Sequence, residues 1–149
     1  MAQTTDGLSL VDCKIETSLN GSVWADRSGF SNSVEVDGGD RAIGETHTAS
    51  GDTPIVTKGK RAARSIKIKA VYTEGASDVF EDVRAAYEAG SLYYVRYSPK
   101  GGSTGNFMFT SDPGYIESFK MPSGEFGDGA AAMIEFTVKT AKITKSVVA

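Results

Sequence analysis

Residues 34–75 read VEVDGGDRAIGETHTASGDTPIVTKGKRAARSIKIKAVYTEG, and this stretch decides the architecture of the chain. Two strand-like segments, Val34–Asp37 and Arg64–Thr73, flank a polar excursion of roughly 26 residues that is rich in Gly, Asp, Thr, Lys and Arg. Long loops without secondary structure are uncommon inside compact domains, and those that occur are functional or disordered. We therefore expect the excursion to be an arm that orders against another subunit on assembly. This indicates assembly rather than chemistry.

Length and composition describe an ordinary globular chain. The 149 residues correspond to one domain, 1–149, and are 40% hydrophobic and 23% charged. The net charge of −3 gives no basic field that would attract nucleic acid. Because there is one cysteine, Cys13, no disulfide can form within the chain. The first ten residues lack the features of a signal peptide, and the longest apolar run, GAAAMI, is too short for membrane insertion.

Alternating apolar and polar residues predict most of the strands. In the first of these, Val11–Glu16, the side chains of Val11, Cys13 and Ile15 share one face. Asn20-Gly21 predicts a type I′ turn before a returning strand that begins at Val23 and Trp24. After the arm, one face of the returning strand carries Ile66, Ile68, Ala70 and Tyr72, and the other carries Lys67 and Lys69.

One helix is predicted over residues 78–89. Asp78 is a good N-cap residue, and Glu81 stands at the capping-box position. Gly90 occupies the place of a left-handed C-cap. Apolar residues at spacings of three and four form one stripe, made of Phe80, Val83, Ala86 and Tyr87. This helix should lie on a sheet with its charged face in water.

The second half of the chain is again strand-like. The β-prone runs are Leu92–Tyr97, Phe107–Thr110, Tyr115–Phe119 and Ala132–Lys139. Residues 122–129 predict a flexible loop, and residues 141–149 a β-prone C-terminal extension without a partner strand. The total is seven or eight strands and one helix, which makes the chain mainly β.

Catalytic and metal-binding patterns are missing. A zinc site needs three or four convergent ligands, and the chain has one histidine, His47, inside the polar arm. No nucleophile elbow accompanies His47, so we predict no catalytic residue, no cofactor site and no metal site; the chain is not an enzyme. Cys13 is expected in the core, Asp37–Asp40 in a turn rather than a calcium loop, and residues 101–105 in a hairpin loop.

Two groups of residues leave alternatives open. The basic cluster of Lys58, Lys60, Arg61 and Arg64 is either a solvated charge run, a contact with acidic residues of a neighbouring subunit, or a nucleic-acid contact. The aromatic group of Tyr93, Tyr94 and Tyr97 is either core or a stacking surface for a sugar or base.

Several turn and strand segments together resemble a known family. They are Leu19–Gly29 (LNGSVWADRSG), Asp37–Arg41 with Gly44-Glu45, Gly51–Val56 with Gly59–Arg61, and Val71–Glu74 before the helix. Over roughly residues 11–140 the chain resembles the tail tube protein, or major tail protein, of bacteriophages with long non-contractile tails. The order of hairpin, long arm, helix and remaining strands also matches.

The resemblance implies a fold and a set of partners. The fold would be a small β-sandwich or barrel-like domain with one flanking helix and a long β-arm (residues 34–75). Copies would form hexameric rings, with sheets joined across subunits, and the rings would stack into a tube around a tape-measure protein. Tail-tip and tail-terminator proteins would complete the tail. Double-stranded DNA would pass through a mostly acidic lumen without specific binding, in a virion assembled in the host cytoplasm.

This resemblance also suggests roles for particular residues. In the arm, contacts between subunits and rings would be made by Arg41, Glu45, Asp52, Lys58, Lys60 and Arg61. Acidic residues that could face the lumen are Glu35, Asp37, Glu117 and Glu135. Lys67 and Lys69 argue against assigning their strand to an acidic lumen. The alternative function is a carbohydrate- or receptor-binding β-sandwich that uses Trp24 with Tyr93, Tyr94 and Tyr97.

Overall fold

The computed structural model describes residues 1–149. It contains eleven strands and one helix: β1 (Lys14–Ser18), β2 (Ala25–Asp26), β3 (Ser31–Gly38), β4 (Arg41–Thr46), β5 (Ile55–Arg61), β6 (Arg64–Val71), α1 (Val79–Ala89), β7 (Tyr94–Ser98), β8 (Phe107–Ser111), β9 (Gly114–Ser123), β10 (Met133–Thr140) and β11 (Ile143–Val147). The predicted fold class, mainly β with one flanking helix and a long β-arm, is confirmed. The predicted number of strands was too low.

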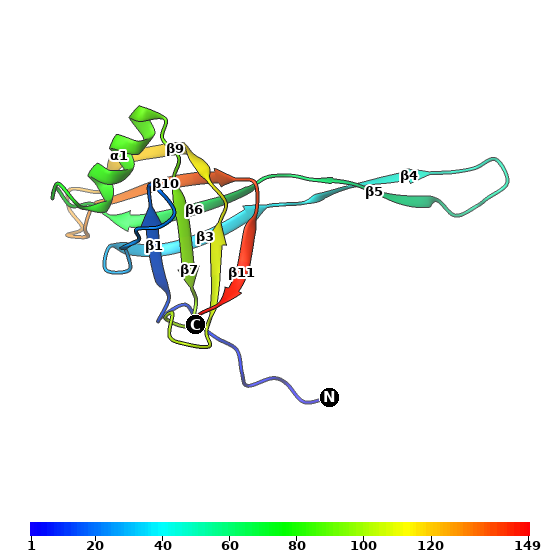
Figure 1. Cartoon of the computed structure of the whole chain (residues 1–149), viewed down its shortest axis with the longest axis horizontal. Helices are drawn as coiled ribbons and strands as arrows, with labels where there is room; N and C mark the ends of the chain where they lie inside the picture. Colours follow the sequence, from blue (N-terminus) through cyan, green and yellow to red (C-terminus); the bar gives the residue numbers. More distant parts are fainter.

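Two sheets form the body and a third forms the arm. Sheet A has the strand order β11-β8-β7-β1-β2, and sheet B has the order β3-β6-β10-β9. The strands of sheet A cross those of sheet B, α1 lies at one end of the body, and the hairpin of β4 and β5 extends from the other end (Figure 1). All pairings within the sheets are antiparallel. Hereafter the arm denotes residues 41–61.

The core lies on the inner face of sheet B. Ile66, Ile68 and Ala70 of β6 stand opposite Val138, Phe136 and Ile134 of β10, and all six are buried. The alternation predicted for β6 is therefore confirmed, because Lys67 and Lys69 lie on the other face. Sheet A closes the core with Ile15 and Val95, among others, and Tyr93, which directly precedes β7, is buried with them.

Helix α1 covers the part of the core beside β9. Val79, Val83 and Ala86 are buried, and Gly90 ends the helix in the left-handed region at φ 65°, as expected from its C-cap position. Asp78 is the N-cap residue, but the predicted capping box is wrong. The Asp78 carboxylate accepts a hydrogen bond from the Gly75 N–H instead of capping the helix, and Glu81 pairs with Arg84.

Three aromatic rings hold α1 against β9. Phe119 of β9 packs between Phe80 and Tyr87, with ring centroids 5.6 Å and 6.0 Å away. Tyr87, predicted as part of the apolar stripe, is 45% exposed because it sits at the margin of this contact. The stripe prediction therefore holds for Val83 and Ala86 and partly for Phe80.

A buried arginine joins sheet A to the helix. Arg27 donates hydrogen bonds to the Thr17 hydroxyl (3.1 Å), the Ser77 carbonyl (2.9 Å) and the Asp82 carboxylate (3.0 Å). Tyr93 donates to the same carboxylate at 3.1 Å. Burial, followed by the charge of Asp82, raises the pKa of Tyr93 far above its usual range. The sequence alone gives no sign of this network, because its members lie far apart in the chain.

The first hairpin differs from its prediction. Strand β1 begins at Lys14, and Val11 is 84% exposed instead of sharing the buried face of Ile15. The type I′ turn at Asn20-Gly21 is wrong, because only Gly21 has positive φ. Asn20 instead accepts hydrogen bonds from the Ser22 and Val23 N–H groups through its side chain. This side-chain turn lengthens the connection between β1 and β2.

Three predictions for the second half of the chain also need correction. The C-terminal extension has a partner: β11 pairs with β8 along five residues and forms an edge of sheet A. Strand β9 runs to Ser123, so Pro122 lies in the strand and the loop covers residues 124–132. Strand β7 starts at Tyr94, and Leu92 is exposed. The single helix, at 11 residues, is too short to cross a bilayer.

Candidate assembly surfaces

Two glycines turn the chain from sheet B into the arm. Gly38 and Gly39 have φ values of 78° and 76°, a region that side chains other than glycine rarely adopt. A Cβ atom on Gly38 would lie 2.4 Å from the Ala63 carbonyl oxygen, and the Gly39 N–H donates to that same oxygen. The predicted turn at Asp37–Asp40 is confirmed, and it directs the arm away from the body (Figure 1).

The arm is a two-stranded antiparallel hairpin. Strand β4 pairs with β5 from Arg41 opposite Arg61 to Thr46 opposite Ile55, and every residue of both strands is exposed. The strands of this segment pair with each other within one chain, and its ordering against another subunit stays a prediction. An isolated hairpin is marginally stable in water, so a partner surface would stabilise it further.

All six arm residues predicted to make contacts lie on this hairpin or its tip. Arg41 and Glu45 belong to β4; Lys58, Lys60 and Arg61 belong to β5; Asp52 lies in the tip. None forms an ion pair within the chain. Arg41 donates one hydrogen bond, to the Gly59 carbonyl at 3.0 Å. Arg64 of the same basic cluster lies at the base of the arm, where it donates to the Gly38 carbonyl.

The arm also exposes aliphatic side chains that were not among the predicted contact residues. Ile43, Ile55 and Val56 are 59%, 52% and 60% exposed. All three residues are β-branched, which favours a strand, but strand propensity alone does not tell whether the strand is buried. Apolar side chains on a projecting hairpin provide contact area for a second protein surface.

The four acidic residues predicted for the lumen come together on the outer face of sheet B. Glu35 and Asp37 lie on β3, Glu117 on β9 and Glu135 on β10. Glu135 pairs with Lys67 at 3.6 Å and Lys69 at 3.9 Å. Four lysines share this face, and they are Lys67, Lys69, Lys120 and Lys139. The face is thus balanced between four carboxylates and four ammonium groups.

Both edges of sheet B are long strands with one partner strand each, apart from a bridge between Gly114 at the start of β9 and Tyr93. Strand β3 has eight residues and pairs with β6, whereas β9 has ten residues and pairs with β10. Their outer backbone groups are available for pairing with a further strand. Because four antiparallel strands alternate in direction, β3 and β9 run in opposite directions.

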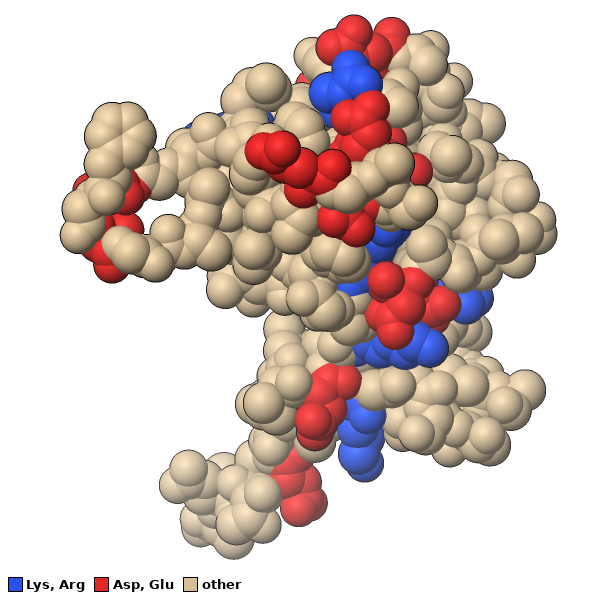
Figure 2. All heavy atoms as spheres, turned by 90° about the vertical axis from the view of Figure 1, so that its left-hand side faces the viewer, with Lys and Arg blue, Asp and Glu red and all other residues tan.

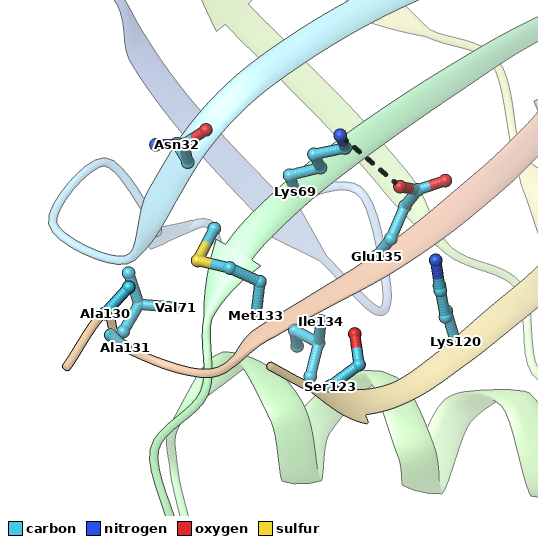
Figure 3. A pocket seen from close by; sticks show the side chains of 10 residues that line it. All are labelled: Asn32, Lys69, Val71, Lys120, Ser123, Ala130, Ala131, Met133, Ile134 and Glu135. Carbon is cyan, nitrogen blue, oxygen red and sulfur yellow. Dashed lines mark ion pairs between the residues drawn. The ribbon is translucent and has the colours of Figure 1, made fainter. Parts of the chain in front are cut away.

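A hollow of about 500 Å³ lies at one end of the outer face of sheet B. Figure 3 shows Met133 on its floor, Ala130 and Ala131 at one side, and Lys69 with Glu135 at another. Asn32 of β3 and Lys120 of β9 lie at opposite sides of this hollow. The hollow therefore spans the width of the sheet from one edge strand to the other.

The loop at residues 124–132 stands at the end of the molecule opposite the arm (Figure 1). In Figure 2, which looks at that end, a lobe with acidic side chains projects from the body, and a band of mixed acidic and basic residues crosses the surface. Phe126 in this loop is fully exposed. The sequence predicted a loop here, but its exposed aromatic residue was not among the predicted site residues.

The aromatic residues of the alternative function do not form one platform. Tyr93 is buried, and Tyr97 is half-buried and stacked on Phe109 with centroids 5.3 Å apart. Tyr94 points to the opposite side of β7, where its ring meets Trp24 edge-on at 6.4 Å. The core prediction is thus confirmed for Tyr93, and the four rings cannot stack together on one sugar.

No group of three or more His, Cys, Asp or Glu side chains is arranged to hold a metal ion. His47 is exposed in the tip of the arm, as expected for a solvated residue. Cys13 is half-buried against the core, and burial raises the pKa of its thiol.

Several solved structures have a fold similar to that of this chain. A chain of the SPP1 tail tube matches with 17% identity and a TM-score of 0.66, covering 91% of this chain and 77% of that chain. The chain has the fold of tail and tube proteins. A chain from the tail of an empty gene transfer agent (GTA) particle with C6 symmetry matches with 16% identity and a TM-score of 0.65, covering 99% and 100%.

A chain from a contractile injection system has a similar fold. A chain of the sheath–tube complex of the PVC extracellular contractile injection system matches with 11% identity and a TM-score of 0.67, covering 99% and 100%. No protein-family model and no curated protein matches the sequence.

Proposed function

We propose that the chain is the subunit of a phage-type tail tube, which self-assembles into stacked hexameric rings and serves as a conduit for the genome. The observation that carries this proposal is the fold likeness to tail and tube proteins over nearly the whole chain. One of these structures, the GTA tail, is described with C6 symmetry. The tail of the virion, assembled in the host cytoplasm, would be the location.

Sheet B supplies a physical route to a closed ring. Because its edge strands β3 and β9 run in opposite directions, a copy rotated about the ring axis places β9 antiparallel beside the neighbour's β3. Pairing continues around the ring and removes both exposed edges. A head-to-tail contact of this kind forms a closed ring when its repeated rotation brings the last copy back to the first.

The size of such a ring is compatible with a conduit. Six copies of the four-stranded sheet supply 24 strands. At a spacing of about 4.8 Å they enclose a ring about 37 Å across at the backbone, before strand tilt widens it.

The outer face of sheet B is our candidate for the lumen wall. Lysines in a DNA channel would retain DNA, because each phosphate neutralised adds binding through counterion release. Three of the four lysines on this face are matched by carboxylates: Lys67 and Lys69 share Glu135, and Lys139 pairs with Glu117 at 3.6 Å. Glu35 and Asp37 add negative charge at the β3 edge. DNA would therefore pass without specific binding.

The arm would contact the next ring. Its charged side chains form no ion pair within the chain and its aliphatic residues are exposed, and both features favour this role. The tape-measure, tail-tip and tail-terminator proteins would be the other partners. A purely structural role leaves no need for catalytic residues, so we propose that the chain is not an enzyme.

The type of tail is a finer part of the proposal. The resemblance of the turn segments favours a phage with a long non-contractile tail. The structural neighbours come from contractile injection systems as well as from the SPP1 and GTA tails.

Negative-stain electron microscopy of the purified protein, over a series of concentration and salt, tests the proposal. Hollow tubes or six-fold rings are expected. Single particles at every concentration, unchanged when tail-tip and tape-measure proteins are added, would overturn it.

A further inference from the structure

Phe126 is the most exposed aromatic side chain of the body and has no role within the chain. It lies in the loop at residues 124–132, where Glu125 and Asp128 flank it with negative charge. It is not among the residues that line the hollow on sheet B of its own chain. A fully exposed phenyl ring next to two carboxylates is suited to a partner surface that is apolar inside and basic at its margin.

The hollow on the outer face of sheet B has those properties. Val71, Ala130, Ala131 and Met133 give it an apolar lining. Lys69, Lys120 and Glu135 stand at its margin; Glu135 pairs with Lys69 at 3.9 Å, whereas Lys120 forms no ion pair within the chain and is the free cation of this margin. Its volume of about 500 Å³ exceeds that of a phenyl side chain, so it has room for one ring.

Strand directions bring the loop of one copy to the hollow of the next. If β9 of one copy pairs antiparallel with β3 of its neighbour, the end of β9 at Ser123 lies beside the start of β3 at Ser31. Asn32, the next residue of β3, lines the hollow. The loop that follows Ser123 therefore begins at the mouth of the neighbour's hollow.

The distance can be bridged. Val71 lies at the end of β6, the second strand in from the β3 edge, so it stands two strand spacings, or about 10 Å, from the neighbour's β9. Three residues from Ser123 to Phe126 reach about 10 Å when extended, before the length of the side chain is added.

We propose that Phe126 of one subunit inserts into the hollow of the adjacent subunit within a ring, with Glu125 and Asp128 facing the neighbour's Lys69 and Lys120. The partner is a second copy of this chain, and the inference rests on the proposed ring assembly. The contact orients adjacent subunits beyond the register that backbone pairing of β3 and β9 provides.

Two variants break opposite halves of this contact. Phe126→Ser removes the ring, and Ala131→Trp fills the hollow from an exposed position. Each should leave the far-ultraviolet circular dichroism and the unfolding midpoint unchanged. Each should also raise the protein concentration needed for tubes on the order of tenfold or more, as expected for a buried aromatic anchor. Val23→Ser, at another exposed apolar position in the β1–β2 connection, is the matched control and should assemble normally.

Mixing the two variants gives a sharper result. The Ala131→Trp chain keeps an intact loop, and the Phe126→Ser chain keeps an intact hollow, so one of the two possible contacts between them is complete. An equimolar mixture should form heterodimers in sedimentation velocity but no rings. Neither variant alone should dimerise at that concentration.

Cysteine crosslinking locates the contact directly. In a Cys13→Ser background, Gly127→Cys is placed on one chain, where an added Cβ meets no atom within 4 Å. Asn32→Cys is placed on a second, longer-tagged chain. Mild oxidation of assembled mixtures should give a covalent heterodimer, and pairing Gly127→Cys with Val23→Cys should not.

The outcomes separate this inference from the proposed function. Wild-type tubes together with normal assembly of Phe126→Ser and no crosslink would overturn the inference and leave the tube role standing. Wild-type protein that forms neither rings nor tubes would overturn both. Loss of assembly with an unchanged fold, together with the crosslink, supports both.

Discussion

Deleting the arm should separate folding from assembly. The change replaces residues 41–61 by the dipeptide Asn-Gly and keeps Asp40 and Ala62, so that β3 and β6 are joined by a short turn. The Gly39 N–H bond to the Ala63 carbonyl lies outside the deleted segment. We expect a folded body that no longer forms tubes.

The expected change in stability follows from exposure. Every residue of β4 and β5 is exposed, so the deletion removes no buried side chain. The connection between the paired residues Gly38 and Arg64 shortens from 25 residues to six. Loop-closure entropy then lowers the free energy of the folded state by about 1 kcal/mol relative to the unfolded chain. The free energy of unfolding should therefore stay the same or rise by that amount.

Urea unfolding followed by circular dichroism measures this free energy at a concentration too low for assembly, and electron microscopy scores tubes at high concentration. A companion variant keeps the hairpin but replaces Ile43, Ile55 and Val56 by Ser, and it should fail to assemble in the same way. A loss of more than about 2 kcal/mol in the deletion variant would refute the reasoning on stability. Tubes of normal appearance from the deletion variant would refute the role of the arm.

Three further predictions concern the body. Phe136→Ala should lower the free energy of unfolding by about 3–5 kcal/mol in urea, because the ring is fully buried between the sheets. Arg27→Met should cost about 3 kcal/mol by the same measurement, because it leaves Asp82 without its cation, and Asp82→Asn added to it should recover part of the loss. Since the folded-state pKa of Tyr93 is raised, its contribution is complete below the unfolded tyrosine pKa of about 10 and is lost as the pH rises above that value. Stability should therefore fall from about pH 10 upward, and Tyr93→Phe should reduce that fall; an equally steep fall in the variant would contradict this assignment.

Predictions from the sequence succeeded where a few neighbouring residues decide the structure. Alternation along β6 identified Ile66 and Ile68 as core and Lys67 as outward-facing, since a strand places successive side chains on opposite faces. Gly90 was recognisable as a C-cap because only its own φ angle is involved. Each of these signals lies within one element.

They failed where two distant segments had to meet. The alternation that placed Ile15 correctly also included Val11, but no strand covers Val11, and it is exposed. The sequence of the C-terminal segment that forms β11 does not indicate that its partner is β8, which lies more than 30 residues earlier in the chain. Pairing of strands is a property of both segments, and one of them alone does not contain it.

For the candidate surfaces the division is similar. The polar composition of the arm indicated that its charged residues are not buried in a core. The structure agrees, because the hairpin that carries them is exposed. It could not show that Glu35, Glu117 and Glu135 share a face with four lysines. That neighbourhood depends on the order of strands in sheet B.

By itself, then, the sequence determined the strand character of the chain, its one helix with the buried stripe, and the polar segment that became the arm. These follow from side-chain period, cap residues and glycine positions, which act over a few residues. Only the tertiary structure decided which strands became the open edges of sheet B, that Tyr93 and Arg27 share Asp82, and where Phe126 and the hollow stand. Those features arise from contacts between segments that are far apart in the chain, and packing selects among the many pairings that local preferences allow.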